Sequence, residues 1–248
     1  MAAGSGALVT ALVLVAAHAI PAPRGTWSVR GDAVHLAGRG EVVALRSSAG
    51  RFDLEPVDLI DEPDVMETWT ELDAFFARQT ALRGVLDGAA VEAVLADGRS
   101  VPVEVAPRPI VELHWTFFSQ LFAALLAWLA GLVPFAYSDR GVGARAYAIS
   151  AVGIAVVLWP ACVYTTRGLA IDGDLFRALS LLDHAGGHLY ANAFLSLFLV
   201  YPVRLVKRLA PVAALGVLAF VLEATRALPV PVVGFYTTMS IYVLAFLA

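Results

Sequence analysis

The chain has 248 residues, of which 59% are hydrophobic and only 15% are charged. Soluble domains carry about 25% charged residues, so this composition excludes an ordinary soluble protein and indicates helices that lie in lipid. The single cysteine, Cys162, excludes an intramolecular disulfide.

The charges divide the chain into two unlike parts. Residues 23–113 hold nine arginines and sixteen carboxylates, a net charge of −7, whereas residues 114–248 hold eight cations and five anions, a net charge of +3. We therefore expect a membrane protein with a small α+β soluble domain over 23–113 and a helical membrane part over 114–248.

Residues 1–22 begin with an apolar segment from Ala2 to Ile20, just long enough to cross a bilayer. It is interpreted as an additional N-terminal transmembrane helix. A cleaved signal peptide is the alternative, because "AHA" (17–19) resembles a cleavage site. Either interpretation exports residues 23–113.

Local signals in residues 23–113 predict alternating strand and helix. The Val-rich run 40–48 predicts a strand, and 57–63 is a second, shorter candidate. Thr68 with Glu71 fits a capping box, and apolar residues at helical spacing predict a helix over 68–84. Two Val-rich runs flank Asp97-Gly98, which predicts a hairpin.

Apolar runs dominate after residue 113 and predict a bundle of five transmembrane helices. Short loops with excess Lys and Arg mark the cytoplasmic side. With the acidic domain outside, the inner loops carry five cations and the outer loops three, so the C-terminus is cytoplasmic in a multi-pass inner-membrane protein. The expected spans are 114–137, 146–165, 185–203, 209–224 and 229–248.

Three cations follow the third of these spans closely: Arg204, Lys207 and Arg208. Three are too few for a nucleic-acid surface, so we interpret them as topology anchors beside the lipid bilayer. The chain ends at Ala248 directly after an apolar run, which leads us to expect a further cytoplasmic domain beyond it.

Polar residues near the predicted spans are candidates for sensing a ligand or signal. His184 and His188 stand one helical turn apart, beside Asp183, but the expected third metal ligand is missing. A polar helix entry, a metal site and a pH sensor remain open for this group; we predict no metal and no cofactor.

Two further candidates are Arg167 and Glu223. Arg167 is predicted to be an interfacial anchor whose side chain extends to the membrane surface. Glu223 is a carboxylate near a span, and Arg226 three residues later is its expected partner on one helical face. The stretch around Asp172-Gly173 is interpreted as a turn.

Two stretches resemble known proteins. Residues 58–105 look like the second half of a PDZ-like module, with a short strand, a helix and a strand pair. Residues 158–208 resemble the multi-span sensor region of certain bacterial membrane histidine kinases. The matching residues are Tyr164, Thr166, Arg167 and Leu169 of a "Y-[ST]-T-R-x-L" step, then Tyr201, Pro202 and Arg204 of a "YP-x-R" step.

This resemblance implies the signal-input part of a two-component sensor histidine kinase, acting as a homodimer on an unknown extracytoplasmic ligand or protein, with kinase domains after residue 248. No hydrolase, nucleotide-binding or metalloprotease motif occurs, so no catalytic site is expected in this segment. The rivals are a stand-alone membrane scaffold or accessory protein with a PDZ-like domain, and a membrane enzyme that uses Asp183, His184 and His188.

Overall fold

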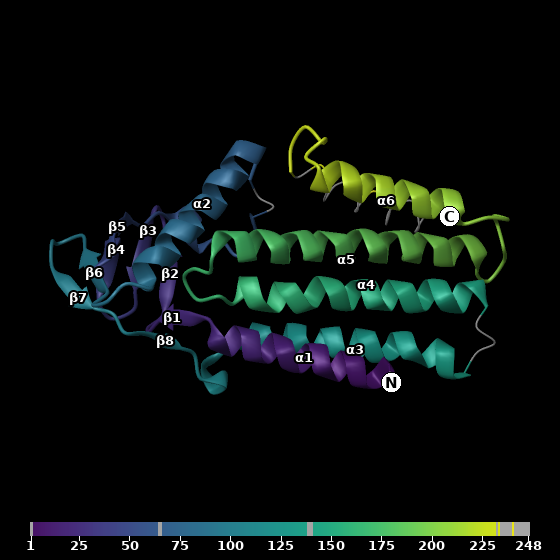
Figure 1. Cartoon of the computed structure of the whole chain (residues 1–248), viewed down its shortest axis with the longest axis horizontal. Helices are drawn as coiled ribbons and strands as arrows, with labels where there is room; N and C mark the ends of the chain where they lie inside the picture. The colour runs from purple at the N-terminus through teal and green to yellow at the C-terminus, as the bar shows by residue number, and fades with distance from the viewer. Residues whose placement is uncertain (1, 64–65, 138–140, 232, 234–239, 241–248) are drawn as a thin grey trace.

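The computed structural model describes residues 2–63, 66–137, 141–231, 233 and 240 of the chain. The protein is a mixed α+β structure in which a sheet domain lies at one end of a group of long helices (Figure 1). The acidic segment forms the sheet domain, and helices precede and follow it in the chain. The coarse fold prediction, an α+β domain joined to a helical part, is therefore confirmed.

The main sheet is antiparallel, with strand order β2-β3-β4-β6-β7 and with β5 also paired to β4. The long strand β4 is the one that the run 40–48 predicted. The predicted hairpin is also confirmed, because β6 and β7 flank Asp97-Gly98 and Gly98 has a φ of +85°. The bounds are β2 (Trp27–Arg30), β3 (Ala33–Leu36), β4 (Gly40–Ser47), β5 (Gly50–Asp53), β6 (Glu92–Leu95) and β7 (Ser100–Pro102).

A separate two-stranded ribbon joins the sheet domain to the helices. Strand β1 (Pro21–Pro23) pairs antiparallel with β8 (Val105–Pro107), so that Ala22 lies opposite Ala106. The ribbon brings together the places where the chain enters and leaves the domain. The end of α1 and the start of α3 therefore lie at the same end of the molecule. A short 3-10 helix, η3 (Ile110–Glu112), precedes α3.

Helix α2 (Trp69–Leu86) confirms the predicted helix over 68–84. The Thr68 hydroxyl accepts a hydrogen bond from the Glu71 N–H at 3.1 Å, and the Glu71 carboxylate accepts one from the Thr68 N–H at 3.2 Å. This reciprocal cap satisfies N–H groups that the first turn leaves without partners. Buried side chains of α2, among them Leu82 and Leu86, pack on the sheet.

The strand predicted over 57–63 is wrong. Residues Pro56–Leu59 form a 3-10 helix, η1, and the Asp58 carboxylate accepts a hydrogen bond from the Glu55 N–H at 2.8 Å. Proline suits the first position of a helical turn, and a short acidic side chain that bonds nearby backbone competes with strand pairing.

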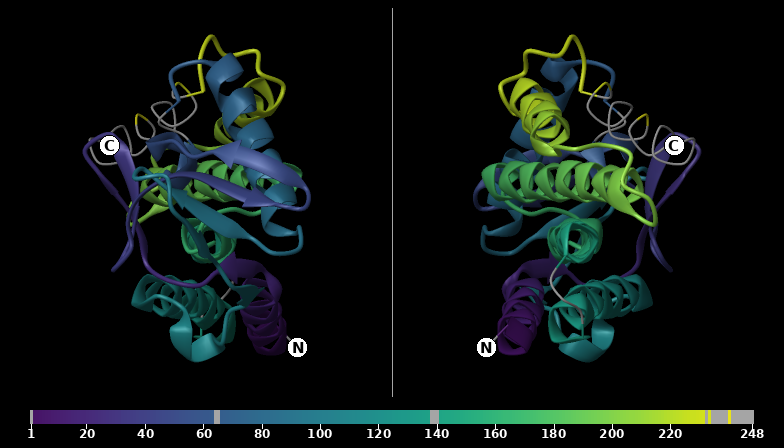
Figure 2. Two further views of the ribbon diagram at one scale, coloured as in Figure 1. Left: turned by 90° about the vertical axis from the view of Figure 1, so that its left-hand side faces the viewer. Right: turned by 90° about the vertical axis from the view of Figure 1, so that its right-hand side faces the viewer.

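The helices lie in layers around α4 and α5. Views along the helices show α1 and α3 on one side of α4, and α6 on the far side of α5 (Figure 2). Helix α5 is continuous through Gly186-Gly187. Gly186 lies so close to α4 that a Cβ there would be 2.6 Å from the Val157 nitrogen. The bounds are α1 (Ala2–Ala19), α3 (Trp115–Tyr137), α4 (Val142–Thr165), α5 (Gly173–Val200) and α6 (Ala210–Ala224).

The prediction of five spans is corrected to two within the described residues. By length and composition, Trp115–Pro134 and Val142–Thr165 are apolar enough to cross a membrane, whereas Gly4–Ala19 and Ala210–Ala224 are shorter apolar helices. Helix α5 is long enough, but polar residues in its middle lower its hydropathy. The predicted span 229–248 lies mostly outside the described residues, which include only 229–231, 233 and 240 of it.

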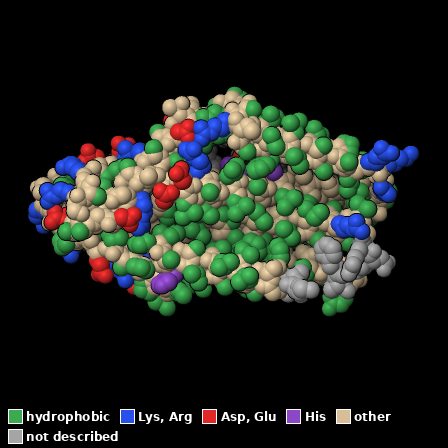
Figure 3. Space-filling model, viewed as in Figure 1, with side chains coloured by type: hydrophobic (Ala, Val, Ile, Leu, Met, Phe, Trp, Pro, Cys, Tyr) green, Lys and Arg blue, Asp and Glu red, His purple; other side chains and the backbone are tan. Residues whose placement is uncertain are grey.

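The helices have a hydrophobic exterior. Figure 3 shows a broad apolar surface over them, with charged side chains gathered on the sheet domain and at the opposite end of the helices. Exposed apolar side chains of these helices include Leu12 of α1, Phe122 of α3 and Leu215 of α6. Contiguous exposed apolar surface of this kind marks contact with a partner or a membrane.

Candidate functional site at the junction of the sheet domain and the helices

The loop between α4 and α5 inserts into the sheet domain. Leu169 and Ala170 are both 0% exposed and belong to the same core cluster as the sheet residues and α2. Ile171 packs in a second cluster with Phe75 of α2 and Phe176 of α5. The sheet domain is thus completed by a segment that is far away in the sequence and that connects two long helices.

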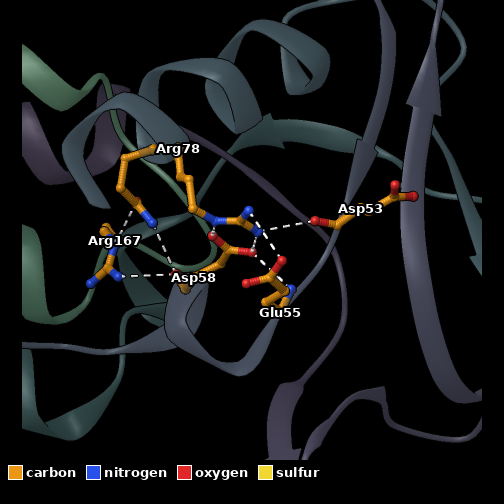
Figure 4. Close-up of polar contacts among 6 residues, drawn as sticks. Asp53, Glu55, Asp58, Arg78 and Arg167 are labelled. Atoms are coloured by element: carbon orange, nitrogen blue, oxygen red, sulfur yellow. Dashed lines mark hydrogen bonds and ion pairs between the residues drawn. The ribbon is translucent and has the colours of Figure 1, made fainter. Parts of the chain in front are cut away.

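Arg167 lies at the base of this loop and is 2% exposed. Its guanidinium donates to the backbone oxygens of Tyr164 at 2.9 Å, Ile60 at 2.6 Å and Asp58 at 3.3 Å. It also donates to the Gln79 side-chain oxygen at 3.2 Å. Figure 4 shows Arg167 of the α4–α5 loop reaching Asp58 of η1, with Arg78 of α2 on the other side of Asp58. The prediction of an interfacial anchor is therefore wrong.

Burial of the Arg167 cation is unfavourable, and its lowered pKa reflects this. Burial lowers the pKa of Arg167 to about 10, and the nearby charges of Asp61 and Asp58 oppose that effect. The guanidinium also lies 4.7 Å from the centre of the Phe176 ring. A buried charge is tolerated when hydrogen bonds satisfy it, so Arg167 fixes the spacing between the sheet domain and the helices.

A second arginine holds the η1 turn that Arg167 contacts. Arg78 donates to both carboxylate oxygens of the fully buried Asp58, at 2.8 and 2.7 Å, and reaches the Glu55 carboxylate at 3.3 Å. These hydrogen bonds to Asp58 raise the pKa of Arg78. Gln79 donates to the Asp58 backbone oxygen at 3.0 Å, so Asp58 is the shared centre of the network.

A cluster of charged residues, here called the charged clamp, joins α2 to α5 and to the segment after α6. Asp73 of α2 accepts hydrogen bonds from Arg177 of α5 at 2.8 Å and from both terminal nitrogens of Arg226 at 2.6 and 2.7 Å. The Arg226 hydrogen bond lowers the pKa of Asp73. The Trp69 indole N–H donates to the Leu228 oxygen at 2.8 Å. Helix α2 is therefore tied to the segment after α6.

Two histidines meet a carboxylate between α5 and α6. His188 Nε2 lies 2.6 Å from one oxygen of Glu223, and His184 Nδ1 contacts the other oxygen. Glu223 is 5% exposed. An ionised carboxylate only accepts hydrogen bonds, so each histidine carries a proton on the nitrogen that faces it.

The expected partner of Glu223 was wrong, because α6 ends at Ala224. Arg226 lies beyond the helix with a φ of +58° and points to Asp73 instead.

The predicted group of Asp183, His184 and His188 is divided between two places. Asp183 contacts the Tyr164 hydroxyl on the α4 side of α5, whereas the histidines face α6. No group of three or more His, Cys, Asp or Glu residues within the described part of the chain is arranged to hold a metal ion. The Asp172 side chain accepts from the N–H groups of Asp174 and Leu175 and so caps α5.

The remaining motif residues lie in two regions. Thr166 is buried beside Arg167 and donates to the Cys162 oxygen, so this first step belongs to the junction. Helix α5 ends at Val200, and the second step follows at the end of the bundle opposite the sheet domain. There Arg204 donates to the backbone oxygens of Val206 and Lys207. The exposed residues of this stretch include the motif residues Tyr201, Pro202 and Arg204, the cations Lys207 and Arg208, and the apolar Val203 and Leu205.

Sequence reasoning missed Asp58, Asp73 and Gln79, the partners that make the junction. Each is an ordinary residue of a soluble segment, and only contact over a long sequence distance gives it a role. One signal was readable in the sequence. The apolar run "GLAI" (168–171) follows Arg167 in the segment that connects two helices, where polar surface residues are usual.

The fold and junction define a mixed α+β protein, and two helices of its described part are apolar enough to cross a membrane. Comparison with protein families, with curated proteins and with solved structures finds no match for this chain.

Proposed function

We propose that the chain is the signal-input region of a membrane sensor, in which the sheet domain detects an extracytoplasmic signal and passes it to the helices. The observation that carries this proposal is the insertion of the α4–α5 loop into the core of the sheet domain. A change in the sheet domain cannot leave this loop unaffected, because tightly packed interiors transmit strain.

The arrangement of charges supports a membrane orientation with the sheet domain outside. The start of α4 and the end of α5 lie together, since a Cβ on Gly143 would be 3.7 Å from the Tyr201 Cβ. Arg145 and the exposed cations at 204, 207 and 208 are therefore near one end of the helices, and the sheet domain is at the other. This is the pattern of a cytoplasmic end rich in Lys and Arg.

The helices would respond to a signal through two connections of different character. Arg167 and the inserted loop form a buried connection to α4 and α5, whereas Asp73 forms an exposed connection to α5 and the segment after α6. Exposed ion pairs contribute little to stability, so the second connection opens more readily than the first. A signal that opens it would release α2 from α5 and from the segment after α6.

The resemblance to sensor kinases makes a bacterial histidine kinase the proposed parent protein, active as a homodimer. The coding sequence beyond codon 248 tests this directly. An in-frame dimerisation segment with a phosphorylatable histidine, followed by an ATP-binding domain, supports the kinase. A stop codon contradicts it and leaves a stand-alone membrane scaffold or accessory protein.

Coupling across the junction is tested with a chimera that joins residues 1–248 to the dimerisation and ATP-binding domains of a histidine kinase. Arg167→Met should change autophosphorylation by about fivefold or more, the range of typical coupling energies. The matched control is Arg46→Met, which removes an exposed arginine of β4 paired with Glu92. Equal activity of both variants and the parent chimera would contradict the proposed coupling.

A further inference from the structure

A cavity of about 280 Å³ lies where α2, α5 and α6 meet, beside the charged clamp. Its walls are of two kinds. Trp69, Leu72 and Phe76 of α2 supply an aromatic and apolar wall, and Arg177, His184 and Glu223 supply ionisable groups. Sites for drug-sized ligands occupy about 300–1,000 Å³, so this cavity suits a small ligand with a short apolar part.

The mouth of the cavity carries more positive than negative charge. Arg177 and Arg226 line the cavity with side chains that are 45% and 37% exposed, so they mark its open side, and both donate to the single carboxylate of Asp73. A guanidinium has five N–H donors, and the contacts with Asp73 use one from Arg177 and two from Arg226. One carboxylate therefore serves two cations at a half-exposed position.

Aromatic rings hold both guanidinium groups against the apolar wall. The Arg177 guanidinium lies 5.2 Å from the centre of the Phe76 ring, and that of Arg226 lies 5.5 Å from the Trp69 ring. Such stacking is favourable and orients the plane of the cation. Positive charge thus stands directly at the edge of an apolar surface, which is the arrangement that an amphipathic anion requires.

The opposite wall decides which way such a ligand would lie. Both oxygens of Glu223 are engaged by His184 and His188, and this carboxylate repels a second anion at the inner end. The anionic head group is therefore directed to the arginines at the mouth. The apolar body is directed to the α2 wall and Leu181.

We infer that this cavity binds a small amphipathic anion, with a carboxylate or phosphate head group held by Arg177 and Arg226. The ligand reaches the mouth either as a free molecule or as part of a membrane lipid. Its role as the signal rests on the proposed function, whereas its binding does not. By competing for the arginines it would weaken the hold of Asp73 on α5 and on the segment after α6.

The test is calorimetric titration of the chain, in nanodiscs of zwitterionic phosphatidylcholine, with octanoate and with octanol, against empty nanodiscs. Octanoate should bind. Octanol should bind at least about tenfold more weakly, because it lacks the charge. Arg177→Gln should weaken octanoate binding about tenfold or more, while Arg46→Gln, a change at an exposed distant arginine, should leave it unchanged. Equal binding of octanoate and octanol would overturn the inference.

Two filling variants test the location. Leu72→Trp from α2 and Leu181→Trp from α5 should each abolish octanoate binding, with circular dichroism showing that the helices are retained. Undiminished binding in both folded variants places the ligand elsewhere and contradicts the site. Nanodiscs that contain anionic phosphatidylglycerol distinguish the sources, since a lipid occupant would weaken the apparent octanoate affinity. Binding without any response of the kinase chimera would refute the proposed function and leave the site intact.

Discussion

Replacing Arg167 with methionine should separate the sheet domain from the helices. The substitution keeps a long apolar side chain but removes four hydrogen bonds, three of which end on backbone oxygens. Each hydrogen bond from a charged donor contributes about 1.5–3 kcal/mol, and their sum is offset by the cost of burying the cation. That cost is evident in the pKa of Arg167, which burial lowers to about 10.

Arg167→Met should lower the free energy of opening the sheet domain by about 3–5 kcal/mol, the usual result of removing one member of a buried charged network. Arg167→Lys should lower this free energy by less, because the ammonium keeps the charge. Some loss should remain, because an ammonium cannot reach all four acceptors. The assay is hydrogen exchange of the β4 amides in nanodiscs, which reports the free energy of opening the sheet domain.

Arg46→Met is the matched control, because it makes the same chemical change at an exposed ion pair of β4. It should alter the opening free energy by less than about 0.5 kcal/mol. If Arg167→Met lowered the opening free energy by less than about 1 kcal/mol, the reasoning would be refuted. The buried hydrogen bonds would then contribute too little to hold the sheet domain to the helices.

Four further outcomes are expected. Leu169→Ala should lower the opening free energy of the sheet domain by about 2–5 kcal/mol, whereas Leu175→Ala, at a 43% exposed position of α5, should cost far less. Thr68→Ala should cost about 1 kcal/mol in the same exchange measurement, through the lost cap of α2. Glu223→Gln should speed exchange in α6 roughly tenfold, because an amide cannot accept from both histidines. The pKa of Asp73 is lowered from its ordinary value of 3.8, so the clamp contributes its full stability at pH values above 3.8 and loses it as the pH falls through the folded pKa. Hydrogen exchange of segment 225–231 should show this acid transition, and Asp73→Asn should abolish it.

The short-range features of this protein were readable because their causes are local. The Thr68 capping box, the Asp97-Gly98 turn and the apolar helices each depend on residues within a few positions of one another. The strand predicted over 57–63 failed for a local reason as well, since the Asp58 side chain forms a turn with the Glu55 backbone. A strand pattern cannot show which side chains bond their own backbone.

The partners of the ionisable residues were not readable. Glu223 and Arg226 stand at the spacing of a helical pair, but the helix ends between them and each turns to a different neighbour. His184 adjoins Asp183 in sequence, yet the two point to different helices because successive residues of a helix face apart. Periodicity gives the face of a helix and not what lies against it.

The sequence by itself determined that this is a chain with an acidic α+β segment and long apolar helices, because composition, caps and turn residues act over short distances. Only the tertiary structure decided that the loop after Arg167 completes the sheet domain. A buried cation is stable only where several acceptors converge on it, and here they come from positions about a hundred residues apart in the chain.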